Sequence, residues 1–236
     1  MAPLAVWTRY PWLCGYLAAP GAYHVVSQVA PCYKWATPLL AGMAAPAPLL
    51  AFGWHFHFLR RAAEVVFLNV YHGKGIPDER DSVIEFVYYT VWGIINGCTA
   101  ACLKSSDSAK SLKDSPLAIF GLALFGLAQA GNFYCHAHLR SLRPDPKDTN
   151  WVIPQKFPFS ILVAPHYTFE VLGWVGFALA SGLAPPSILI NLLTFGILSD
   201  CAQKRKEKYM KMYKQGGPKI EGPSPDRRWL LIPFIY

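Results

Sequence analysis

The sequence predicts an all-α fold, namely a polytopic membrane helix bundle of about six transmembrane helices. Hydrophobic residues make up 53% of the 236 residues and charged residues only 15%, a balance too apolar for an ordinary soluble domain. Several apolar runs approach the roughly 20 residues that a helix needs to cross a bilayer. The basic residues are unevenly distributed between the loops, as in membrane proteins of fixed orientation.

Six segments are expected to form the spans: 10–33, 37–58, 83–103, 115–139, 166–183 and 185–203. The first of them contains Pro and Gly and is the weakest. The last two are joined by Leu183-Ala184-Pro185-Pro186, where proline ends one helix and begins the next. The stretch 157–165 is apolar but short, and fits either a re-entrant or an interfacial segment.

The charge distribution supports this count, because six spans place both termini on one side. That side then carries 18 of the 22 Lys and Arg residues, and the other side carries 4. The positive-inside rule assigns the basic side to the cytosol or an equivalent compartment. The formal net charge is +8, and nine basic residues lie within 204–228. This cluster indicates an anionic membrane surface or ligand, and no nucleic-acid partner is expected, because no binding motif accompanies the charge.

Polar residues at membrane depth fall on helical stripes. Asn132, His136, Arg140 and Arg143 follow spacings of 4, 4 and 3, which place them on one narrow face of a helix. Three further stripes have the same periodicity: Tyr167, Glu170 and Trp174; Glu85, Tyr88 or Tyr89, Trp92 and Asn96; and His57, Arg60 or Arg61, and Glu64.

Each stripe has a purely structural alternative. Arg140 and Arg143 could anchor a helix end, Glu170 could form a packing ion pair, and Asn96 could satisfy a kinked backbone. Because charged groups are costly within a membrane, four stripes together favour a shared polar cavity. A metal site is not expected, since the spacing in HFH (55–57) and HAH (136–138) puts the two imidazoles on different helix faces. No Rossmann or P-loop motif is present either.

Several blocks resemble the steroid 5α-reductase and very-long-chain trans-2-enoyl-CoA reductase family. GNFYCHAHLRSLRP (131–144) is similar to the family block GNxxxHxxLRxLRP, and the stretch from WVIPQKFPF to GWVGFALAS (151–181) is similar to a second block. HFLRRAAEVVFLNVYHG (57–73), AQKRKEKYMKMY (202–213) and the terminal LIPFIY also resemble family blocks. The matches lean toward the enoyl-CoA branch. They divide the chain into an N-terminal membrane segment, 1–55, outside the resemblance, and a reductase-like domain with a basic tail, 56–236.

The resemblance implies a multi-span helical bundle that uses NADPH to reduce a carbon–carbon double bond conjugated to a carbonyl. Hydride adds to the β carbon while a protein acid polarises the carbonyl. Tyr167 and Glu170 are the expected catalytic residues. The residues expected at the cofactor are Asn96, Asn132, His136, Arg140, Arg143, His166, Lys206 and Tyr209.

Three motif positions depart from the family pattern. Phe58 stands where the family has Tyr, His166 where it has Asn, and Lys206 where it has His. Two hypotheses therefore stay open: an enzyme that reduces an acyl-CoA or sterol substrate, and a non-catalytic subunit with a structural or lipid-binding role among partner membrane subunits. Membrane lipids are expected partners in both. The resemblance implies the endoplasmic reticulum, and the mitochondrial inner membrane is the alternative.

Overall fold

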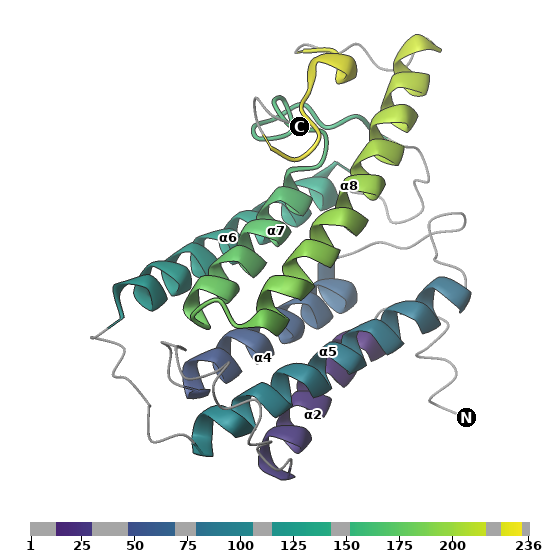
Figure 1. Ribbon diagram of the computed structural model, residues 1–236. Helices are drawn as coiled ribbons and strands as arrows, with labels where there is room; N and C mark the ends of the chain where they lie inside the picture. Colours follow the sequence, from purple (N-terminus) through teal and green to yellow (C-terminus); the bar gives the residue numbers. More distant parts are fainter. Residues whose placement is uncertain are drawn as a thin grey trace.

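The computed structural model describes residues 13–29, 47–68, 79–105, 115–142, 152–215 and 223–232 (Figure 1). The regular elements within these ranges are helices, so the predicted all-α fold is confirmed for the described part of the chain. In chain order they are α2 (Leu13–Val29), α4 (Ala47–Ala63), the π-helical turn η1 (Glu64–Leu68), α5 (Glu79–Ser105), α6 (Pro116–Ser141), α7 (Pro165–Ala180), α8 (Pro185–Lys214) and the short 3-10 helix η4 (Pro225–Arg227).

Helix α4 lies between two groups of helices. Figure 1 shows α6, α7 and α8 on one side of α4, and α2 and α5 on the other. The large side chains of α4 fill the centre. The Trp54 ring lies 5.6 Å from the Trp174 ring of α7, and its indole N–H donates to the Ala19 carbonyl of α2 at 3.3 Å. One buried indole therefore links three helices.

Glycines allow the closest helix approaches. A methyl group added at Gly121 of α6 would lie 2.4 Å from the backbone nitrogen of Ala180, so α6 and α7 touch through their backbones. On α5, Gly93 and Gly97 face α2 in the same way, and a methyl group at Gly93 would lie 2.5 Å from the Ala19 carbonyl oxygen. Two small residues four positions apart are typical of tightly packed membrane helices.

Proline begins three of the helices, as is common at the first helical position. At α6 the Ser115 hydroxyl also accepts a hydrogen bond from the Ala118 N–H at 3.3 Å. Between α7 and α8, Gly182 and Leu183 adopt positive φ angles of 70° and 62°. This left-handed pair ends α7, and Pro185 starts α8, so the predicted proline connection joins these two helices.

A helix lies in each of the six predicted spans, but their lengths differ from the prediction. Helix α4 continues past residue 58 to Ala63, and α8 runs 11 residues beyond 203 to Lys214. Among the described helices, α6 and α8 are long and apolar enough to cross a membrane. Helix α4 has only 17 residues, fewer than the roughly 20 that a full span needs, and its last turn contains Arg60 and Arg61. The count of six spans stays a prediction.

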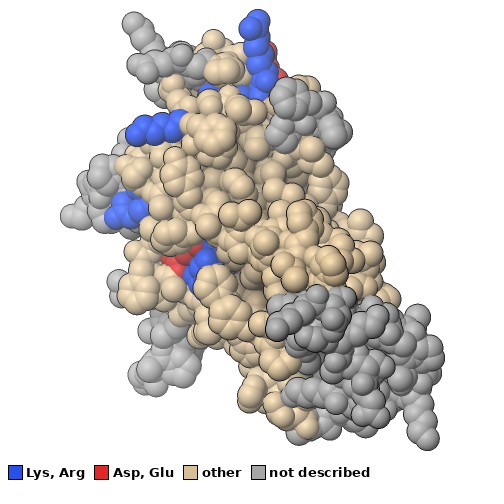
Figure 2. Space-filling view, turned by 90° about the vertical axis from the view of Figure 1, so that its left-hand side faces the viewer, with Lys and Arg blue, Asp and Glu red and all other residues tan. Residues whose placement is uncertain are grey.

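Apolar side chains dominate the surface between the charged ends. Figure 2 shows a face on which uncharged residues cover most of the described part, with Lys and Arg confined to a few places. Phe120 and Leu127 on α6 are 60% and 73% exposed, and Leu192 on α8 is 63% exposed. A soluble protein rarely exposes a continuous apolar surface of this kind, so these faces suit contact with lipid.

The residues before α7 form turns that pair with the C-terminal segment. Leu162 and Trp229 form an isolated parallel β-bridge. Arg228 is buried, and its guanidinium donates to the carbonyls of Pro154 at 2.6 Å and Pro223 at 3.0 Å. Burial lowers the pKa of Arg228 below its ordinary value. The short apolar stretch 157–165 thus supports the chain's last described residues.

Candidate functional site

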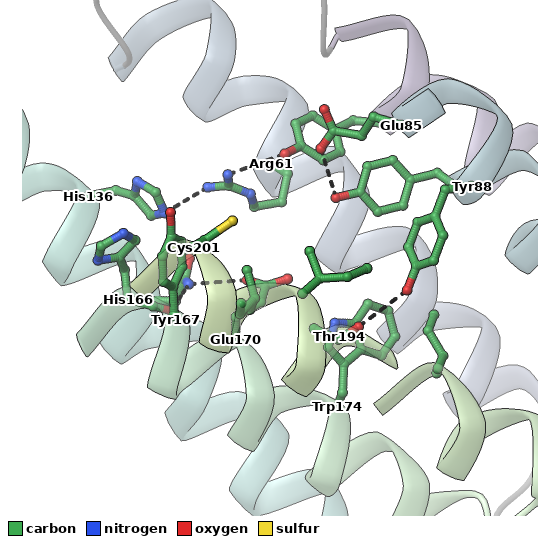
Figure 3. Close-up of a pocket in the computed structure, with 16 residues that line it drawn as sticks. Arg61, Glu85, Tyr88, His136, His166, Tyr167, Glu170, Trp174, Thr194 and Cys201 are labelled. Carbon is green, nitrogen blue, oxygen red and sulfur yellow. Dashed lines mark hydrogen bonds between the residues drawn. The ribbon is translucent and has the colours of Figure 1, made fainter. Parts of the chain in front are cut away.

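A cavity of about 300 Å³ opens between α2, α4, α5, α6, α7 and α8. Its lining is apolar over one part, where Trp174, Ile190 and Leu198 lie. Polar side chains form the other part, and Figure 3 shows six of them: Arg61, Glu85, His136, His166, Tyr167 and Glu170. Asn132 also lies there. A largely apolar pocket with a few convergent polar groups is the usual form of a small-molecule site.

Glu64 anchors the charged part of the site. It lies in η1, directly after α4, and is only 2% exposed. Its carboxylate accepts hydrogen bonds from Arg60 and from Arg61, one on each oxygen. Arg60 and Arg61 precede Glu64 by four and three positions, the spacings at which side chains on a helix meet. A buried carboxylate shared by two arginines fixes the direction of both side chains.

Asn132 of α6 is the central hydrogen-bonding residue. Its side-chain carbonyl accepts from Arg60 Nη1 at 2.9 Å. Its amide donates to the backbone carbonyl of His166 at 2.8 Å and to Glu170 Oε2 at 3.1 Å. Both ends of this buried amide are therefore used, and they connect α4, α6 and α7.

Gln129 lies one helical turn before Asn132 and completes this connection. Its carbonyl oxygen accepts from Arg60 Nε at 2.9 Å and lies 3.2 Å from His57 Nδ1. Because this oxygen can only accept, His57 Nδ1 carries a proton. The other imidazole nitrogen of His57 lies 3.2 Å from Glu170 Oε1. The His57 ring therefore connects Gln129 of α6 to Glu170 of α7.

Arg61 connects the first described helix to the site. One of its nitrogens lies 2.9 Å from His136 Nε2, which must accept because arginine only donates. Another donates to the Tyr16 hydroxyl at 3.3 Å. The guanidinium carbon also lies 5.3 Å from the centre of the Tyr16 ring, within the range of a cation–π contact. Tyr16 of α2 is thereby held at the edge of the cavity.

Tyr167 has a similar arginine partner from α8. Arg205 Nη2 donates to the Tyr167 hydroxyl at 3.2 Å, and its guanidinium carbon lies 5.3 Å from the centre of the ring. The His166 ring lies 4.2 Å from the Tyr167 ring. A positive charge next to a phenol favours negative charge on the phenol oxygen. The Tyr167 oxygen thus acts as an acceptor toward Arg205, and its own O–H is left for another partner.

The structure brings together five of the residues that the sequence singled out for the site. Asn132, His136, His166, Tyr167 and Glu170 all line the cavity, and of these His166 was named as a departure from the family pattern. Phe58, the other buried departure, is fully enclosed, with its ring 5.2 Å from the Tyr89 ring and 6.1 Å from that of Trp174. It belongs to the apolar core rather than to the cavity wall.

Other predicted cofactor residues lie away from the cavity. Asn96 is buried on α5 and donates to the Trp92 carbonyl at 2.9 Å, as expected of the structural alternative. Lys206 donates to the Arg228 carbonyl at 3.0 Å, and Tyr209 is buried in the cluster that holds the C-terminal segment. Arg140 is half-buried at the end of α6. Arg143 lies outside the described residues.

Three site residues were missed in the sequence: Tyr16, Gln129 and Arg205. Gln129 precedes Asn132 by three positions, so helical periodicity could have found it. Arg205 was counted only as a charge of the basic tail. Tyr16 lies in the weakest predicted span, and its role depends on the long-range contact with Arg61.

The residues present suit a dinucleotide cofactor. His166 Nδ1 is buried and has no hydrogen-bond partner within the described part of the chain, so it is open to a ligand. Asn132 and His136 line the cavity on the same α6 stripe that leads to Arg140, and arginines bind phosphate oxygens well. The cavity volume is at the small end of ligand sites, which suits the reacting ends of two molecules.

Comparison with known proteins identifies related sequences. A family model described as 3-oxo-5-alpha-steroid 4-dehydrogenase matches residues 80–236. A probable very-long-chain enoyl-CoA reductase of Caenorhabditis elegans is 26% identical over 80% of this chain and 59% of its own length. The very-long-chain enoyl-CoA reductase of Dictyostelium discoideum is 28% identical over 77% of this chain and 56% of its own length.

A steroid-converting relative is also similar. The human 3-oxo-5-alpha-steroid 4-dehydrogenase 1 is 32% identical over 50% of this chain and 40% of its own length. The chain thus spans less than two thirds of the length of these curated relatives. The resemblance seen in the sequence blocks is confirmed, including its relation to enoyl-CoA reductases.

Proposed function

The chain belongs to the 3-oxo-5-alpha-steroid 4-dehydrogenase family, and on this premise we propose that it is an NADPH-dependent membrane reductase. The proposed reaction reduces a carbon–carbon double bond conjugated to a carbonyl. The observation that carries the proposal is the Tyr167–Arg205 pair, which presents a phenol beside a polar cavity. The names of the relatives support two substrate classes, enoyl-CoA thioesters and 3-oxo steroids.

In this mechanism the chain's own residues polarise the carbonyl. Arg205 donates to the Tyr167 oxygen, which leaves the phenol O–H free to donate to the carbonyl oxygen of the substrate. As electron density moves onto that oxygen, the nearby guanidinium stabilises the charge that Tyr167 takes up. Glu170 is held by Asn132 and lies against His57, and in this role it orients the cofactor and Tyr167.

NADPH, when bound, would supply the hydride that adds to the β carbon. The enolate that results takes up the proton of Tyr167, so the double bond gains one hydride and one proton. Asn132, His136 and His166 would contact its nicotinamide part, and Arg140 and Arg143 its phosphates. We place Lys206 and Tyr209 in support of this site through the C-terminal segment, because Lys206 bonds Arg228 and Tyr209 packs beside Leu231. Asn96 has a structural role in this proposal.

We further propose that the chain crosses the membrane of the endoplasmic reticulum six times, with membrane lipids around it. The apolar surfaces of α6 and α8 support membrane insertion. The mitochondrial inner membrane is the alternative location. The boundary at residue 55 marks where the resemblance begins. It falls inside α4, so we propose that residues 1–55 and 56–236 form one bundle.

The test is NADPH oxidation by the purified protein in detergent, with trans-2-hexadecenoyl-CoA and with a 3-oxo-4-ene steroid as substrates. Tyr167→Phe should lower kcat by about 100-fold or more, the usual effect of removing a donor to a developing oxyanion. Tyr213→Phe is the matched control, because Tyr213 lies on the exposed part of α8, and it should leave the rate unchanged.

Two results would contradict the proposal. If the wild-type protein bound no NADPH at millimolar concentration, the reductase proposal would fail. The alternative hypothesis, a non-catalytic subunit with a structural or lipid-binding role, would then replace it. If the protein turned over but Tyr167→Phe kept the full rate, the acid would lie elsewhere and the reductase assignment would stand without Tyr167.

A further inference from the structure

Tyr16 extends the site beyond the part of the chain that matches the family model. It lies on α2, outside residues 80–236, and lines the cavity opposite α7. We infer that Tyr16 is a second phenolic donor, which hydrogen-bonds the carbonyl oxygen of the substrate together with Tyr167. This inference rests on the proposed function and adds a residue to it.

The hydrogen bond from Arg61 leaves the Tyr16 proton available. Arginine has donors only, so the 3.3 Å contact between Arg61 Nη2 and Tyr16 uses the tyrosine oxygen as the acceptor. In the hydrogen bond that the Tyr16 hydroxyl makes within the described residues, it is thus the acceptor and not the donor. Its own O–H therefore remains to be satisfied by a ligand, and a buried donor without an acceptor is costly.

The surroundings of Tyr16 and Tyr167 are alike. Each phenol oxygen accepts from an arginine, at 3.3 Å from Arg61 and 3.2 Å from Arg205. Each ring also has the guanidinium carbon 5.3 Å from its centre. A carbonyl oxygen has two lone pairs and can accept from two donors. Two arginine-held phenols that line one cavity therefore offer the two donors that a carbonyl oxygen can accept.

The neighbouring tyrosines of α5 do not offer this arrangement. Tyr89 lines the cavity, but its hydroxyl donates to Glu85 Oε1 at 3.1 Å. Tyr88 shares a hydrogen bond of 3.4 Å with Thr194 of α8. Figure 3 shows both contacts as dashed lines, on the side of the cavity away from Tyr167. Of the three tyrosines on this side, Tyr16 is the one whose oxygen is held by a cation.

Packing fixes the position of Tyr16. The side chain is 4% exposed, and its ring lies 5.3 Å from the Tyr89 ring and 6.3 Å from the Phe58 ring. Next to it, Gly15 lies close to α5, where an added methyl group would be 3.2 Å from a Tyr89 ring carbon. Phe58 has no hydroxyl to offer, so in this corner of the site the donor comes from α2.

The experiment compares Tyr16→Phe with Tyr23→Phe, because both substitutions remove one buried hydroxyl of α2 and keep the ring, and Tyr23 does not line the cavity. The first measurement is the infrared carbonyl band of trans-2-hexadecenoyl-CoA, labelled with ¹³C at the thioester carbonyl and bound with NADP⁺ so that no turnover occurs. A hydrogen-bonded carbonyl absorbs at lower frequency. The band should move back toward its unbound position in Tyr16→Phe and stay in place in Tyr23→Phe.

The second measurement is steady-state kinetics with NADPH and the unlabelled thioester. We expect Tyr16→Phe to lower kcat by about 100-fold, as for other lost oxyanion donors, while KM for NADPH and the melting temperature stay near wild type. Tyr23→Phe should keep kcat within a few fold.

The outcomes separate this inference from the proposed function. If the wild type turned over and Tyr16→Phe had the same rate and the same carbonyl band as the wild type, the role of Tyr16 would be overturned. The proposed reductase activity would stand. A raised KM for NADPH with an unshifted band would also overturn it, because Tyr16 would then act only by positioning Arg61. A wild-type protein with neither turnover nor a shifted carbonyl band would refute both proposals.

Discussion

Replacement of Asn132 by leucine gives the sharpest test of the polar network. Leucine has the same number and branching of heavy atoms but no polar atoms, so Asn132→Leu removes three hydrogen bonds at once: those with Arg60, Glu170 and the His166 carbonyl. Two of these involve charged groups. The groups left behind are largely enclosed, since Asn132 is 2% exposed. A loss of stability is therefore expected, rather than a neutral exchange.

The size of the loss follows from the partners. Hydrogen bonds to charged groups contribute about 1.5–3 kcal/mol each, and a neutral one about 1 kcal/mol. These contributions are not additive within one network, and water in the adjoining cavity can satisfy part of what is lost. We therefore expect a decrease of roughly 2–4 kcal/mol in the free energy of unfolding. For a chain of this length, that lowers the melting temperature by roughly 5–15 °C.

Asn191→Leu is the matched control. Asn191 lies on α8, and its side-chain oxygen is buried without a hydrogen-bond partner among the described residues, so its loss should cost little. The assay is thermal unfolding in detergent, followed by tryptophan fluorescence, because Trp54 and Trp174 lie in the core near the site. If Asn132→Leu melted no lower than Asn191→Leu, the network would not stabilise the fold as we argue.

Two further substitutions test the packing and charge of the same bundle. Gly121→Ala should lower the melting temperature, because its methyl group would meet the α7 backbone at 2.4 Å and overpacking costs about 1–3 kcal/mol. Gly126→Ala on the same helix is the control, because its methyl group would meet nothing within 4 Å and should not lower the melting temperature. Equal effects of the two substitutions in thermal unfolding would refute the close approach of α6 and α7. Glu64→Gln should lower the free energy of unfolding by about 3–5 kcal/mol, because it leaves Arg60 and Arg61 buried without their carboxylate. If the variant unfolded at the same denaturant concentration as the wild type, these two ion pairs would not stabilise the fold.

Hydropathy and proline positions predicted where the helices lie, because these depend on local properties of the chain. Each predicted span contains a described helix, and the connection at Pro185 joins the last two. The ends were less accurate. Helix α8 continues to Lys214 through a strongly basic sequence, and hydropathy cannot distinguish a helix that leaves the membrane from one that ends there.

The stripe from Asn132 to His136 was found because helical periodicity identifies one face of a helix. Periodicity does not show how far along the helix a site extends. Asn96 shares a face with Tyr88, but it lies eight residues further along α5, which is about 12 Å at 1.5 Å per residue. The cavity reaches Tyr88 and does not reach Asn96. A helical stripe therefore predicts which way its side chains point better than it predicts which of them line the cavity.

The contacts of Arg61 explain why the N-terminal part of the site was not visible in the sequence. Arg61 lies one residue from Arg60, and both meet Glu64, so the sequence cannot tell which arginine faces the cavity. In the structure Arg60 turns to Asn132 and Gln129, whereas Arg61 turns to His136 and Tyr16. This division of roles depends on α2 packing beside α4. If Tyr16 of α2 supplies the second donor, the site still has two phenol hydroxyls although Phe58 of α4 has none. Residues before the matched region then decide whether the site has all the donors that the reaction needs.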